Sequence, residues 1–137
     1  PPQQPDVFIS YPRSRMAWVE KHVYEPLEAW RGAERIFFDK SSLDPGRGWL
    51  AGPATGVETC RVLLPVYCAD YFQRPFCQWE LQLGIALDPL GERQIVVPLM
   101  IEPVEPPSFC KLIQAIDVTG GNAESAMMKA LRQVLPE

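Results

Sequence analysis

The sequence has no excess of positive charge and almost no histidine. It carries 13 Lys and Arg against 17 Asp and Glu, a formal net charge of -4, and its basic residues are scattered. A nucleic-acid surface would need a basic stripe, so no nucleic-acid partner is expected. His22 is the only histidine, and the four cysteines show no CxxC spacing, so no metal site is expected either.

Long apolar runs are also missing. No stretch approaches the roughly 20 residues that a membrane-spanning helix needs. The start, PPQQPDVF, has neither the basic nor the apolar part of a signal peptide. We therefore expect no membrane partner, a cytoplasmic location with reduced thiols, and cysteines that pack as small hydrophobic groups. Residues 1–5 read as a linker into a domain of residues 6–136, which suggests a fused sensor or oligomerisation domain.

Short apolar runs that alternate with amphipathic segments dominate the rest of the chain. At 137 residues with 47% hydrophobic content, the chain is long enough for one domain with a real core. We expect strands at 6–10, 35–39, 60–66, 94–101 and 115–118, with helices at 14–31, 49–58, 75–87 and 122–135. This alternation predicts an α/β fold: a five-stranded parallel sheet with right-handed crossovers and helices on both faces.

Five residues give more local expectations. Ser14 and Asn122 stand where they could cap the first and last helices. Pro26 falls inside the first helix, which should be kinked or split there, while Gly32 should end it. Pro98 lies inside the fourth strand and predicts an edge-exposed or bulged position.

Glu80 is the residue on which the functional interpretation depends. In a parallel sheet, the loops at the strand carboxyl ends gather over one edge, where open α/β sheets bind ligands. These loops are residues 10–13, 40–48 and 67–76, and Glu80 follows the third of them within the expected helix. The loops and the glutamate form one candidate cleft. The plain alternative is a solvated helix glutamate.

Four motifs resemble those of the Toll/interleukin receptor (TIR) domain family. They are DVFISY at 6–11, FFDK at 37–40, GRGW at 46–49 and YCADYFQRPFCQWEL at 67–81. The last motif matches a family pattern of a tyrosine, an aromatic–Cys pair, and a glutamate three residues after the cysteine. Here these residues are Tyr71, Phe76, Cys77 and Glu80. The resemblance covers nearly the whole chain and implies a flavodoxin-like three-layer fold.

The resemblance also implies an activity. Enzymatic TIR domains cleave the nicotinamide–ribose bond of NAD+ to give nicotinamide and ADP-ribose or a cyclic isomer. Glu80 matches their catalytic glutamate, with NAD+ as substrate and no separate cofactor. Such domains act as effectors in immune or antiphage defence, and a neighbouring subunit completes the cleft on oligomerisation. The alternative is a non-catalytic TIR–TIR interaction module that self-associates through the loop from Lys40 to Gly48.

The same resemblance implies a set of substrate-binding residues. An arginine after the first strand could contact the pyrophosphate, and an aromatic residue before the glutamate could stack on a ligand ring. Solvation of the arginine and packing of the aromatic residues are the structural alternatives. The residues are Ser10, Tyr11, Arg13, Asp39, Leu43, Trp49 and Phe76.

The chemistry of Glu80 fits this activity in its own right. Nicotinamide leaves as a neutral pyridine, so no general acid is needed, and the ribose passes through an oxocarbenium-like state. One ionised carboxylate in a partly open cleft could stabilise that charge or hold the ribose hydroxyls. Arg74, nearby, could either pair with Glu80 or bind phosphate. Two other classes remain: a flavodoxin-like phosphoacceptor, for which the first strand lacks clustered acids, and a nucleoside deoxyribosyltransferase-like enzyme.

Overall fold

The fold is built on a five-stranded parallel sheet. The computed structural model describes residues 5–38 and 56–136, so Asp39, Leu43, Trp49 and the loop from Lys40 to Gly48 lie outside the described residues. The strands run in the order β2-β1-β3-β4-β5, and every pairing is parallel. They are β1 (Val7–Ser10), β2 (Ile36–Phe37), β3 (Val62–Tyr67), β4 (Leu99–Met100) and β5 (Ile116–Asp117).

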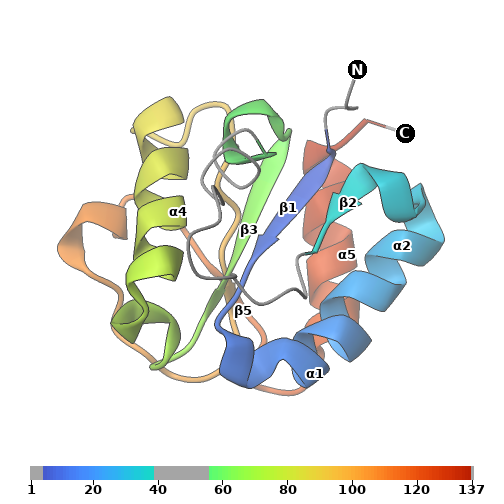
Figure 1. Cartoon of the computed structure of the whole chain (residues 1–137), viewed down its shortest axis with the longest axis horizontal. Helices are drawn as coiled ribbons and strands as arrows, with labels where there is room; N and C mark the ends of the chain where they lie inside the picture. The colour runs from blue at the N-terminus through green and yellow to red at the C-terminus, as the bar shows by residue number, and fades with distance from the viewer. Residues whose placement is uncertain (1–4, 39–55, 137) are drawn as a thin grey trace, which may run out of the picture.

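Helices cover both faces of this sheet, as Figure 1 shows. One face carries α1 (Met16–Val19), a π-helical turn (Glu20–Tyr24), α2 (Glu25–Arg31) and α5 (Ala123–Val134). The other carries α4 (Pro75–Leu87) and the short helical stretch of residues 56–59. The expected three-layer α/β fold is confirmed. Because the strand order reverses between β1 and β3, this pair is the point at which such sheets bind ligands.

Successive residues of β1 pack into different layers of the core. Val7 and Ile9 belong to the cluster with α2 and α5, whereas Phe8 belongs to the cluster with α4. Alternation along the strand therefore sends Ser10 to the α4 side. All six residues of β3 are buried, which is why this strand reads as a continuous apolar run.

Gly84 allows α4 to lie close to the sheet. A Cβ atom at this position would come within 2.4 Å of a Leu63 methyl group and 3.2 Å of a Val96 methyl group. A larger residue would force the buried Leu63 side chain or the helix itself to move. The close approach places Glu80, one turn earlier on the same buried face of α4, directly behind the end of β1.

Pro26 splits the first helix, as the sequence predicts. The π-helical turn Glu20–Tyr24 separates α1 from α2, and Pro26 occupies the first turn of α2. A proline cannot donate to the carbonyl four residues earlier, and the wider turn accommodates the interruption. Gly32 ends α2 with a φ of 95°, a conformation that favours glycine.

Neither expected helix cap is made by a side chain. Ser14 lies inside a 3-10 turn (Arg13–Arg15) and its hydroxyl donates to Asp70 instead of a helix N–H. Asn122 precedes α5, but its side chain makes no capping hydrogen bond. In both cases the residue type is suitable for a cap, but the capping hydrogen bond is not made.

Of the two positions expected for Pro98, edge-exposed or bulged, the edge-exposed one is wrong. β4 pairs with both β3 and β5, so it is an interior strand. The regular strand is only Leu99–Met100, preceded by a single bridge at Val96. Pro98 lies between them, where its missing N–H interrupts the ladder while its carbonyl still accepts from Ile116. In the described part of the chain, no helix is long and apolar enough to cross a membrane.

Candidate functional site

Ser10, Tyr71 and Glu80 meet at the carboxyl end of β1, beside β3. The Ser10 hydroxyl donates to Glu80 Oε1 over 2.7 Å and lies 2.9 Å from the Tyr71 hydroxyl. The Tyr71 hydroxyl also lies 3.1 Å from the carbonyl of Cys77, in the first turn of α4, to which it can donate. Three segments far apart in the sequence are thus joined by one hydrogen-bonded chain.

This polar chain is almost completely buried. Ser10 and Tyr71 have no exposed surface, and Glu80 is 4% exposed, so it is more enclosed than the partly open cleft that the sequence predicts. Burial raises the pKa of Tyr71 well above its usual value; the Cys77 thiol and Glu80 add to the rise, and the hydrogen bond with Ser10 opposes it. A buried carboxylate with a hydroxyl partner at a topological switch point is a typical candidate for a functional group.

Arg74 pairs with Asp70. Its Nε donates to Asp70 Oδ1 over 3.0 Å, one helical turn back, and its side chain is 55% exposed. The pKa of the Asp70 carboxyl is lowered, mainly by the hydrogen bond from Ser14 and then, against the effect of burial, by Arg74. The pairing of Arg74 with Glu80 that the sequence allows is therefore not seen, and Arg74 lies at the surface.

The other described residues of the predicted site lie in different places around the hydrogen-bonded cluster of Ser10, Tyr71 and Glu80. Tyr11 packs on Phe38, with ring centroids 5.0 Å apart, and belongs to the core layer opposite Ser10. Arg13 is exposed in the turn that follows β1. Phe76 is half-buried in the first turn of α4, four residues before Glu80 and against Trp79. The described structure therefore brings Ser10 to Glu80, and places Phe76 one turn from it on the same helix.

Two groups of the site are difficult to recognise in the sequence. Tyr71 reads as a structural residue of the loop, because nothing local connects its hydroxyl to Ser10, 61 positions earlier. Glu102 accepts from the backbone N–H of Ala69 over 3.0 Å and pairs with Arg15. This carboxylate holds the loop after β3 against the turn after β1. The only sequence signal is its place directly after the fourth strand.

The cysteines and the histidine lie in different layers. Cys60, Cys68, Cys77 and Cys110 are all reduced and buried in the α4 layer, whereas His22 stacks on Trp18, 4.7 Å away, on the other face. Burial raises the pKa of the Cys60 thiol to about 12. These positions are incompatible with a catalytic Cys/His pair. Across residues 5–38 and 56–136, no three His, Cys, Asp or Glu side chains gather in a way that could hold a metal ion.

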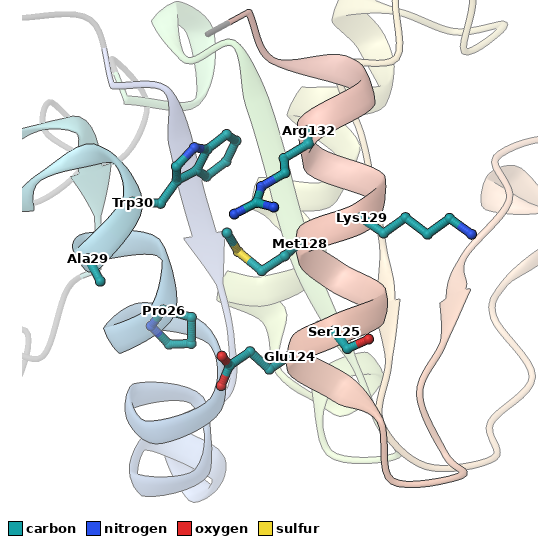
Figure 2. Close-up of a pocket in the computed structure, with 8 residues that line it drawn as sticks. All are labelled: Pro26, Ala29, Trp30, Glu124, Ser125, Met128, Lys129 and Arg132. Atoms are coloured by element: carbon teal, nitrogen blue, oxygen red, sulfur yellow. The ribbon is translucent and has the colours of Figure 1, made fainter.

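A separate groove lies between α2 and α5, on the opposite side of the sheet from Glu80 (Figure 2). It has a volume of about 930 Å³. The guanidinium groups of Arg31 and Arg132 lie 4.3 Å and 5.7 Å from the ring of Trp30. The lining residues are Pro26, Ala29, Trp30, Glu124, Ser125, Met128, Lys129 and Arg132.

Comparisons with known proteins agree with this fold. The family model described as "TIR domain" matches residues 7–135. Toll-like receptor 2 of Canis lupus familiaris is 25% identical over 113 residues, which cover 78% of this chain and 14% of that receptor. The chain therefore corresponds to a small part of this relative. The crystal structure of the TIR domain of the Toll-related receptor TRR-2 from Hydra magnipapillata superposes with a TM-score of 0.70 at 21% identity, covering 93% of this chain and 98% of that one. The chain belongs to the TIR domain family.

Proposed function

We propose that this TIR domain is an NAD+ glycohydrolase in which Glu80 is the catalytic carboxylate. The observation that carries the proposal is the placement of Glu80: it lies at the β1/β3 switch point, hydrogen-bonded to the hydroxyl of Ser10. Burying a carboxylate costs free energy, and buried ionisable groups at such positions are often functional. A site that must stabilise a cationic sugar has a use for such an acid.

The proposed step needs one carboxylate. As the nicotinamide–ribose bond lengthens, its electron pair leaves with the neutral pyridine and positive charge develops on the ribose. Glu80 stabilises that charge, or holds the ribose hydroxyls in the geometry that the transition state requires. Water then adds to the anomeric carbon and loses a proton, giving ADP-ribose. A cyclic isomer forms instead if a nucleophile of the adenine ring attacks.

Substrate access requires a change in the site. Glu80 is only 4% exposed and its Oε1 accepts from Ser10, so NAD+ must displace part of the cover over this carboxylate before the ribose can reach it. This need for opening fits the proposal that the domain is active on oligomerisation, when a neighbouring subunit contributes to the cleft. Arg13, exposed in the turn after β1, is the residue that would contact the pyrophosphate in this proposal.

A second candidate function is a TIR–TIR interaction module in signalling. The observation that favours it is the identity of the relatives: a Toll-like receptor and a Toll-related receptor. In this case the buried hydrogen bonds among Glu80, Ser10 and Tyr71 serve only to hold β1 against α4. Contacts between copies would use the loop from Lys40 to Gly48, with fused sensor domains supplying the signal.

The two candidates differ in whether NAD+ is consumed. We expect the domain, incubated with NAD+ at high protein concentration, to release nicotinamide that chromatography detects. Glu80→Gln keeps the size of the side chain and its capacity to accept from Ser10, but removes the negative charge. Loss of that charge should lower kcat by about 100-fold or more, which is the usual cost of removing a group that stabilises a transition-state charge.

Glu92→Gln is the matched control. Glu92 is an exposed acid in the turn after α4, at the end of the helix away from Ser10. This variant should retain wild-type activity. Absence of nicotinamide from the wild-type domain at every concentration, including an assembled form made by fusion to an oligomerising domain, would contradict the glycohydrolase and leave the interaction module.

A further inference from the structure

The hydrogen-bond contacts that link Glu80, Ser10, Tyr71 and the Cys77 carbonyl outnumber the hydrogens available to make them. Three contacts join Glu80, Ser10, Tyr71 and the Cys77 carbonyl, at 2.7, 2.9 and 3.1 Å. When Glu80 is ionised, only two hydrogens are available, one on each hydroxyl. The arrangement of these two hydrogens therefore decides which groups face the carboxylate as donors.

Distances favour one arrangement. The shortest contact is the one from the Ser10 hydroxyl to Glu80, and a hydroxyl–carboxylate bond is also the strongest of the three. With its own hydrogen on Glu80, Ser10 can interact with Tyr71 only as an acceptor. The Tyr71 hydrogen then lies on Ser10, or is shared with the Cys77 carbonyl, which already accepts within α4.

Tyr71 also fixes the distance between β1 and α4. Its ring is fully buried and packs against the rings of Tyr67 and Phe72, with centroids 5.9 Å and 5.3 Å away, so its hydroxyl has little freedom to move. The same hydroxyl contacts the end of β1 and the first turn of α4. Glu80 projects from the next turn of that helix.

We propose that Tyr71 is a positioning residue for the reaction, which acts through Ser10 to hold the Glu80 carboxylate in place. This inference rests on the proposed glycohydrolase activity. Tyr71 donates to Ser10 and thereby keeps the Ser10 hydroxyl directed at Glu80. Without the phenol, Ser10 can rotate away, and Glu80 loses the Ser10 hydroxyl as a donor that helps to fix its orientation relative to the ribose. Tyr71 is fully buried and contacts Ser10, so we expect it to act on Glu80 through Ser10 rather than by direct contact with NAD+.

The first test is the split between kcat and KM in Tyr71→Phe. We expect kcat to fall about 10-fold, in line with the loss of one oriented group, while KM stays within about two-fold of wild type. Tyr67→Phe is the matched control, since Tyr67 is equally buried in the same aromatic cluster but does not contact Ser10 or Glu80. Its kcat should equal that of wild type. A wild-type kcat in folded Tyr71→Phe would overturn the inference.

A double-mutant cycle tests whether Tyr71 works through Ser10. If it does, Ser10→Ala should lower kcat, and adding Tyr71→Phe to Ser10→Ala should lower it no further. Losses that multiply in the double variant would overturn the coupling. If Tyr71→Phe does not fold, 3-fluorotyrosine at position 71 replaces it, because fluorine strengthens the donor with little change in size. An unchanged kcat in that protein would likewise count against the inference.

A measurement without NAD+ separates this inference from the proposed activity. In protein labelled with ¹³C at the glutamate carboxyl carbons, the Glu80 resonance is assigned by its loss in Glu80→Gln. At fixed neutral pH it should shift in Tyr71→Phe and in Ser10→Ala, and stay in place in Tyr67→Phe. If the wild-type domain releases no nicotinamide but this shift occurs, the activity fails while the positioning of Glu80 holds. No shift in Tyr71→Phe would overturn the positioning itself.

Discussion

Tyr67 and Tyr71 are neighbouring buried tyrosines whose hydroxyl groups have different surroundings. The Tyr71 hydroxyl contacts Ser10 and the Cys77 carbonyl, whereas that of Tyr67 lies beside Cys110 without a partner at hydrogen-bond geometry among the described residues. A buried hydroxyl without a partner costs free energy on folding. We expect Tyr67→Phe to raise the free energy of unfolding by up to about 1 kcal/mol and Tyr71→Phe to lower it by about 1–2 kcal/mol.

Urea denaturation of the two variants and of the wild type checks this difference. The two substitutions remove the same atom from rings in the same cluster, so each serves as the control for the other. Equal changes in the free energy of unfolding would mean that the hydrogen bonds of Tyr71 add nothing to stability.

At this scale the sequence identifies some of the site and misses the rest for a clear reason. Ser10 and Glu80 follow from the rule that parallel strands bring their carboxyl ends to one edge. The partner of Arg74 does not, because Asp70 and Glu80 are both near it along the chain and only side-chain geometry selects Asp70. The role of Tyr71 depends on a contact with Ser10 across the core, which no local pattern encodes.

At the scale of elements, the layer between α4 and the sheet gathers all four thiols. Burial raises the pKa of Cys60 from 9.0 to about 12, and burial together with the nearby Glu80 raises that of Cys77 further still. The folded state thus keeps these protons at a pH where the unfolded chain loses them. The contribution of Cys60 and Cys77 to stability is full well below pH 9 and falls as the pH rises through the unfolded pKa, by at most about 1.4 kcal/mol per pH unit for each of these two thiols.

Urea midpoints measured from pH 7 to pH 10.5 test this expectation. We expect a constant midpoint up to about pH 8.5 and a steady fall above it, because the unfolded thiols begin to ionise in that range. Cys60→Ala should reduce the slope of the fall. A midpoint that stays level up to pH 10.5 would show that the buried thiols do not control alkaline stability.

The order and type of the elements could be predicted better than their details. Alternating apolar runs indicate the parallel sheet, and Pro26 indicates the split in the first helix. The edge-exposed position predicted from Pro98 is wrong, because proline is usual at sheet edges but here directly precedes Leu99 in an interior strand. The expected strand of residues 94–101 is regular only at Leu99–Met100, since the proline removes a ladder donor. Long-range pairing, rather than local propensity, decides such cases.

At the scale of the whole molecule, the Asp6 carboxylate is the centre of a charged cluster at the amino ends of the strands, whereas Glu80 lies at their carboxyl ends. Its carboxylate is 2% exposed and faces three arginines, at the end of α2 and just before β2 and β3. Arg35 Nη2 donates to Asp6 over 2.7 Å, and Arg31 also donates to the carbonyl of Pro136, so this cluster ties β1 to the end of the chain after α5. The backbone N–H of Asp6 donates to the carbonyl of Arg35, and the backbone N–H of Val62 donates to the carbonyl of Asp6, so the start of β1 is also joined to the residues that begin β2 and β3.

Asp6→Asn keeps the shape of this cluster but removes the negative charge that the three arginines share. Three guanidinium groups would then face one another around a neutral amide, and we expect the free energy of unfolding to fall by about 2–3 kcal/mol, less than for a fully buried pair because the arginines are partly exposed.

Arg61→Ala is the matched control: its side chain is 46% exposed, so its loss should cost less than about 1 kcal/mol. Urea denaturation at low and high salt measures both. The loss in Asp6→Asn should persist at high salt, because a buried charge is poorly screened. Equal losses in the two variants would mean that the cluster acts as ordinary surface ion pairs and that packing alone holds this edge together.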